Sequence, residues 1–122
     1  MTRVIVKPID KNKFELAFEY KYESKNQTII IPKGFVTNGA NIPRIFWSFF
    51  PPNSPEYLSA VVIHDFLCLQ AKKSKQYQDA VLADEIFKEA LRTLQVANYK
   101  IKIFYFSCKI YHLYKKYLGF YR

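Results

Sequence analysis

An almost uninterrupted apolar segment from Tyr57 to Leu69 most constrains how this chain can fold. Ser54-Pro55-Glu56 precedes it, and a serine cap with proline in the first turn predicts the start of a helix. Because apolar residues occupy every side of that helix, we expect it to lie in the middle of the fold. The segment also contains His64 and Asp65. Burying such groups is costly unless they are paired, and neighbours on a helix point about 100° apart. Each therefore needs its own partner.

Two further helices are predicted after a lysine-rich connection at Lys72–Lys75. The second has an inward stripe at steps of three and four residues, made of Tyr77, Val81, Asp84, Phe87, Leu91 and Leu94. The third is expected from Asn98 to Lys116, with a buried stripe made of Ile101, Phe104, Cys108, Tyr111 and Tyr114 or Lys115.

The first third of the chain predicts strands. Residues Arg3–Lys7 alternate polar and apolar, and Phe14–Tyr22 places five apolar side chains on one face. A turn at Ser24–Gln27 leads to a third strand at Thr28–Ile31. A long ordered loop, Gly34–Pro55, then connects to the helices. The fold class is therefore α+β: a small N-terminal antiparallel sheet, the loop, and three packed helices.

Size and cysteine content indicate one intracellular domain. The 122 residues fit a single hydrophobic core, so residues 1–122 are expected to be one domain. Cys68 and Cys108 form no close pair, whereas small secreted domains usually carry several paired cysteines. The first residues lack the apolar stretch of a signal peptide, and no apolar run is long enough to span a membrane. We expect a cytoplasmic protein with both thiols free.

The net charge of +9 is concentrated at one end of the chain. Tyr99–Arg122 contains six basic residues and no acidic one. Such asymmetry favours an anionic partner, either a membrane surface or an acidic phage or host protein. Lysines interleaved with tyrosines could also contact nucleic acid, but no recognised nucleic-acid motif supports that interpretation. A solvated helix face is the alternative.

A candidate polar site is predicted around His64 and Asp84. Asp84 lies on the inward stripe of the second helix, so antiparallel packing would let its carboxylate bond a nitrogen of His64. A carboxylate that orients a histidine supports a general base for ester or amide hydrolysis. The loop adds further candidate polar residues, namely Thr37, Asn38, Asn41 and Arg44. The alternative is a structural network. A catalytic His64 should line an open pocket, and a structural one should be sealed.

Zinc is a second interpretation of the same region. His64 and Cys68 are four residues apart, as are Cys108 and His112, so each pair lies one helical turn apart. Together they offer two thiols and two imidazoles, the donor set of many structural zinc sites. Buried cysteines in aromatic helices are, however, usually small apolar residues.

Three segments of the chain resemble a known family. They are PKGFVTNGANIPR at residues 32–44, AVVIHDFL at residues 60–67 and ADEIF at residues 83–87. In order and spacing they resemble the domain-of-unknown-function 1353 family, found widely in phages and prophages. The resemblance implies the fold and a phage or prophage accessory protein, without an agreed activity. Asn38, Asn41 and Cys68 stand where the family usually has aspartate, serine and tyrosine. The tyrosine argues against a zinc site common to the family.

The helix with His64-Asp65 and the later Asp84 is also similar to the core of phospholipase A2 enzymes. That resemblance implies His64 as the base that activates water, Asp65 as a calcium ligand and Asp84 as the residue that holds the histidine. Backbone carbonyls of Gly34–Asn41 would complete the calcium site, since calcium takes six to eight oxygens. The chain lacks the tight glycine spacing and the disulfides of those enzymes.

Overall fold

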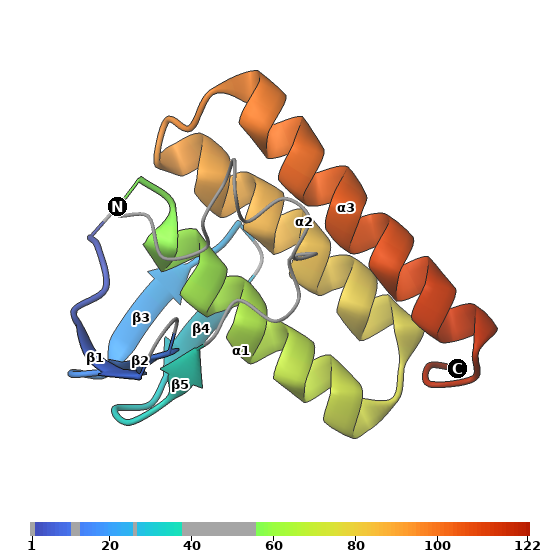
Figure 1. The fold of residues 1–122 in the computed structure, drawn as a ribbon, viewed down its shortest axis with the longest axis horizontal. Coiled ribbons are helices and arrows are strands. Elements are labelled where there is room, and N and C mark those ends of the chain that lie inside the picture. The colour runs from blue at the N-terminus through green and yellow to red at the C-terminus, as the bar shows by residue number, and fades with distance from the viewer. Residues whose placement is uncertain (1, 11–12, 26, 38–55) are drawn as a thin grey trace.

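The computed structural model describes residues 2–10, 13–25, 27–37 and 56–122 (Figure 1). Within them the chain forms five short strands followed by three helices. The strands are β1 (Val6–Asp10), β2 (Lys13–Leu16), β3 (Tyr20–Glu23), β4 (Thr28–Ile31) and β5 (Val36–Thr37). The helices are α1 (Leu58–Ser74), α2 (Tyr77–Thr93) and α3 (Asn98–Tyr117). The predicted α+β class, with antiparallel strands before three helices, is confirmed.

The strands form two antiparallel sheets instead of the single sheet that we expected. One has the order β1-β2-β5, and the other pairs β3 with β4. The predicted strand Phe14–Tyr22 is wrong in extent, because the chain bends at Ala17 and Phe18 between β2 and β3. The alternation still turns Leu16, Tyr20 and Tyr22 inward, but the bend leaves Phe18 62% exposed. Strand β5 falls within the segment predicted as a loop, and its pairing with β2 was not foreseen.

The helices occupy the expected order with different ends. α1 continues through Lys72 and Lys73, which we had assigned to a connection. Lysine is a good helix former, and its charge is favourable in a last turn. The helix ends at Lys75, whose left-handed backbone (φ 59°) reverses the chain into α2. The predicted start at Ser54 and Pro55 lies outside the described residues.

Helix α2 lies between α1 and α3, and the strands lie beside α1 (Figure 1). α1 contacts both α2 and strands β4 and β5, so its predicted central position is confirmed. Its residues from Ser59 to Asp65 are all buried. The inward stripe of α3 ends in His112, and not in Tyr114 or Lys115. Across the described part of the chain, no helix has the length and apolar character needed to span a bilayer.

The turn between β4 and β5 depends on Gly34. Its φ of +91° lies in the left-handed region, and its N–H donates to the Leu16 carbonyl over 2.8 Å. An alanine Cβ would meet only Glu15 Oε1, at 3.8 Å, so substitution strains the backbone without a clash. We expect Gly34→Ala to lower the free energy of unfolding by about 1–2 kcal/mol in urea denaturation. The neighbouring Lys33→Ala serves as the control, and equal effects of the two would contradict this assignment.

Candidate functional site

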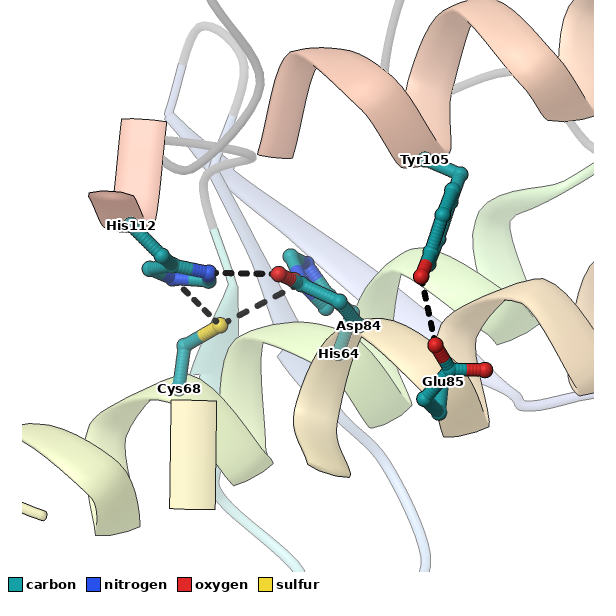
Figure 2. A network of polar contacts seen from close by, with 6 residues as sticks. All are labelled: His64, Cys68, Asp84, Glu85, Tyr105 and His112. Carbon is teal, nitrogen blue, oxygen red and sulfur yellow. Dashed lines mark hydrogen bonds and ion pairs between the residues drawn. The ribbon is translucent and has the colours of Figure 1, made fainter. Parts of the chain in front are cut away.

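A single carboxylate, that of Asp84, holds two buried histidines from two different helices. His64 Nε2, from α1, lies 2.8 Å from Asp84 Oδ1, as the antiparallel packing predicts. His112 Nδ1, from α3, lies 2.7 Å from Asp84 Oδ2. Figure 2 shows both rings beside Asp84, and each imidazole is only 1% exposed. The cluster therefore joins all three helices through one residue of α2.

His112 as a partner of Asp84 was missed from the sequence. The available signal was its spacing, because Phe104, Cys108 and His112 recur every four residues along α3. That spacing places all three on one helix face, and all three are buried. We had assigned His112 only to the zinc hypothesis and had extended the stripe through Tyr111 instead.

The acceptor character of the carboxylate determines where each histidine carries its proton. An ionised aspartate only accepts hydrogen bonds, so the nitrogen facing it must be the N–H donor. His64 is therefore protonated on Nε2, and His112 on Nδ1. This leaves the second nitrogen of each ring as an acceptor. Within the described residues, the buried His64 Nδ1 has no hydrogen-bond partner.

Cys68 lies between the two imidazoles. Its Sγ is 3.4 Å from His64 Nε2 and 3.7 Å from His112 Nε2 (Figure 2). Burial raises the pKa of the Cys68 and Cys108 thiols well above the usual value, and the charge of Asp84 adds to the effect. Both cysteines are free of a disulfide. The Cys68 thiol is thus positioned to donate to His112 Nε2.

The pKa of Asp84 lies below its usual value of 3.8. Burial alone would raise it, but the hydrogen bonds that His112 and His64 donate, together with their electrostatic attraction for the carboxylate, more than offset burial. The folded protein therefore holds this proton less tightly than the unfolded chain does. The ionised Asp84 therefore contributes fully to the free energy of unfolding above about pH 3.8. That contribution is lost as the pH falls toward the lower pKa that Asp84 has in the folded protein.

We therefore expect the difference in unfolding free energy between the wild type and Asp84→Asn to depend on pH in a defined way. It should shrink as the pH falls from about 4 toward the lowered pKa of Asp84 in the folded protein. Urea denaturation of both proteins at a series of pH values measures it. A difference that stays constant to about pH 3 would contradict the lowered pKa.

Asp65 is bound from the strand side of the molecule. Its carboxylate accepts a hydrogen bond from the hydroxyl of Thr37 at the end of β5. The two side chains are 7% and 3% exposed. The sequence predicted both residues for the polar site but did not predict the contact, because β5 was not recognised.

Removing this hydroxyl should be costly because it leaves a buried carboxylate with one donor fewer. We expect Thr37→Val, which keeps the shape, to lower the free energy of unfolding by about 1–3 kcal/mol. Thr37→Ser, which keeps the hydroxyl, should cost less than half as much. Thermal unfolding followed by circular dichroism compares the two. Equal losses would mean that packing of the methyl group, and not the hydrogen bond, holds β5 to α1.

A cavity of about 510 Å³ lies beside the cluster, between α1, β5 and the C-terminal part of the chain. Asp65 and Cys68 form part of its wall, whereas His64 does not line it. The other lining residues are aliphatic, aromatic or basic: Phe35, Val36, Leu69, Lys72, Lys75, Tyr111, Lys115, Phe120 and Tyr121. The site therefore combines a sealed histidine–aspartate network with a neighbouring cavity rich in lysine. Asn38, Asn41 and Arg44, which we also predicted for the site, lie outside the described residues.

Two comparisons relate the chain to known proteins. A family model described as "Protein of unknown function (DUF1353)" matches residues 14–108. The chain is 32% identical over 100 residues to "Uncharacterized protein y4jT" of Sinorhizobium fredii (strain NBRC 101917 / NGR234). That alignment covers 80% of this chain and 28% of the relative, so the chain spans little more than a quarter of the longer protein. No solved structure matches.

Proposed function

Because this chain belongs to the DUF1353 family, whose description names no activity, we propose from the site itself that it is a hydrolase of an ester or amide. In this proposal the protein is a phage or prophage accessory protein, and its site residues have roles like those in a phospholipase. The observation that carries the proposal is His64 Nδ1, a buried atom that has no hydrogen-bond partner among the residues that the structure describes. A buried polar atom without a partner is rare in native proteins, and such an atom calls for a functional explanation.

The proposed mechanism uses the tautomer that Asp84 imposes, and it requires the packing around the buried His64 to open so that water and the substrate reach Nδ1. With Nε2–H donated to Asp84, the Nδ1 lone pair of His64 accepts a proton from a water molecule. The water oxygen then bonds to the carbonyl carbon of the substrate, and the carbonyl π electrons move to oxygen. As the tetrahedral intermediate collapses, the bond to the leaving group breaks and that group takes the proton from Nδ1. Asp84 stabilises the imidazolium between these steps.

Calcium would fit this mechanism through Asp65, the neighbour of the proposed base. Carboxylate oxygens are ligands that calcium prefers, and calcium requires six to eight oxygens in total. Near Asp65 the described residues provide its own carboxylate and the Thr37 hydroxyl. Bound calcium would polarise the substrate carbonyl. The proton transfers at His64 do not depend on it.

The exposed side chains of α3 support the proposal that the protein meets its substrate at an anionic membrane. Its exposed side chains include three lysines among apolar and aromatic residues: Lys102, Phe106, Lys109, Ile110, Leu113, Lys116 and Tyr117. An amphipathic helix of this composition lies in the plane of a membrane interface, with its lysines near acidic headgroups. These side chains are exposed in the part of the chain that the structure describes, whereas the inner face of α3 packs on α2.

The alternative is a non-enzymatic phage structural or interaction protein. The 1% exposure of His64 and its absence from the cavity wall favour this function, since we expected a catalytic histidine to line a pocket. In that case the network only ties α1 and α3 to α2, and the basic face of α3 contacts a phage or host protein.

Fatty-acid release from anionic liposomes, with calcium and with a chelator, separates the two functions. The hydrolase proposal predicts release by the wild-type protein, and release that requires calcium would assign the role of Asp65. Pelleted lipid is assayed for protein in the same samples. Binding without release would support the non-enzymatic alternative with a lipid-contacting α3. Neither release nor binding would overturn the lipid substrate and the membrane partner together.

A further inference from the structure

Five side chains that commonly bind metals meet in the core around Asp84. Two triplets among the described residues bring one donor atom of each member within 4.8 Å of the others. One triplet is Cys68, Asp84 and His112, and the other is His64, Asp84 and Cys108. All five residues are buried, and they come from all three helices. The carboxylate of Asp84 thus has two imidazoles and two thiols close to it, which together form the donor types of a transition-metal site.

The spacing in the first triplet suits a small divalent ion. Zinc binds thiolate at about 2.3 Å and imidazole at about 2.0–2.1 Å in tetrahedral geometry, which places sulfur and nitrogen about 3.5 Å apart. Cys68 Sγ lies 3.7 Å from His112 Nε2. Small side-chain shifts would therefore let both atoms bind one ion. The donors are a sulfur, a nitrogen and a carboxylate oxygen, and thiolate with imidazole selects zinc-like ions over calcium or magnesium.

Access distinguishes the two triplets. Cys68 forms part of the cavity wall, so an ion can reach its sulfur from solvent through the cavity. Cys108 is fully buried, and it does not line that cavity. The first triplet leaves the bond between His64 Nε2 and Asp84 Oδ1 in place. To bind an ion held by His112 Nε2, Asp84 Oδ2 must give up the N–H of His112 Nδ1, which now lies 2.7 Å from it. Three protein ligands with a fourth position toward a cavity is the arrangement of an open zinc site.

From this geometry we propose that Cys68, Asp84 and His112 form a binding site for zinc or a similar divalent transition metal. Binding would replace the proton of the Cys68 thiol and join α1, α2 and α3 through one ion. The site is inferred for this chain only, since the DUF1353 pattern usually has tyrosine at the position of Cys68. The inference does not rest on the proposed hydrolysis, because it uses neither His64 Nδ1 nor a substrate.

Cobalt(II) is the probe for the test, because a thiolate ligand gives it a charge-transfer absorption and tetrahedral coordination gives intense visible bands. The full chain is stripped with a chelator, and cobalt is titrated while its absorbance is recorded. The proposal predicts saturation at one equivalent with both features, and displacement of cobalt by zinc. No thiolate band in the folded wild-type chain would overturn it.

Three variants assign the ligands, and circular dichroism confirms that each is folded before titration. Cys68→Ala should remove the charge-transfer band, and His112→Gln should weaken cobalt binding at least about tenfold. Cys108→Ala, which empties the other triplet, should keep both the band and the affinity. A band lost in Cys108→Ala but kept in Cys68→Ala would overturn this ligand set and assign the second triplet. If both alanine variants fail to fold, Cys68→Ser and Cys108→Ser give the same comparison.

Discussion

Asp84→Ala is expected to lower the free energy of unfolding by about 3–5 kcal/mol. The substitution removes the acceptor of two N–H groups at once, from His64 and from His112. Both rings are 1% exposed, so neither can turn to water without opening the packing of α1 or α3 on α2. Urea denaturation at neutral pH measures the loss. The loss in free energy of unfolding should exceed the loss on replacing any exposed carboxylate residue of the chain with alanine.

Glu85→Ala is the matched control. Glu85 is the next residue of α2, but it is exposed. It accepts a hydrogen bond from Tyr105 (Figure 2), and it also pairs with Lys88. Exposed pairs of this kind contribute about 0–1 kcal/mol. The two variants thus remove neighbouring carboxylates from one helix and differ mainly in burial. If Asp84→Ala costs no more than Glu85→Ala, the network around Asp84 does not hold the helices together.

Replacement of His64 is expected to have the largest effect on function. If Nδ1 of His64 is the general base, His64→Gln should lower the rate of fatty-acid release by about 10²–10⁴-fold, because a glutamine side chain cannot take the proton of water. Release from anionic liposomes at matched protein concentration measures the rate. Circular dichroism and urea denaturation establish that the variant is folded.

His112→Gln is the control that separates a loss of catalysis in His64→Gln from a loss of packing. It removes an imidazole that is equally buried and that binds the same carboxylate, so a general loss of packing affects both variants alike. The rate loss should be greater for His64→Gln than for His112→Gln by at least about tenfold. Equal rate losses that follow the losses in stability would favour the structural alternative.

The helical half of the fold was predictable because its signals are local. The apolar segment around His64 fixed α1 as the central helix, and the three-and-four spacing on α2 turned Asp84 inward. Together these two local patterns predict the contact between His64 and Asp84. A buried aspartate on an apolar stripe needs a donor, and only a few residues can provide one.

The strands and the rest of the site depend on contacts that the sequence does not specify locally. Phe14–Tyr22 alternates well enough for one strand, but tertiary contacts bend it at Phe18 and divide it between two sheets. β5 has two residues, too few for a period, so its contact between Thr37 and Asp65 could not be foreseen. His112 was missed because a buried stripe that continues through Tyr111 and Tyr114 fits the helical spacing on α3 equally well.

The central claim is that Asp84 fixes the tautomer of both histidines and leaves Nδ1 of His64 as a free acceptor. Nitrogen-15 NMR of the histidine side chains tests it most directly, because one-bond and long-range couplings identify the protonated nitrogen of each ring. At neutral pH we predict a proton on Nε2 of His64 and on Nδ1 of His112. A proton on Nδ1 of His64, alone or together with one on Nε2, would contradict the account, because that nitrogen could not accept a proton from water.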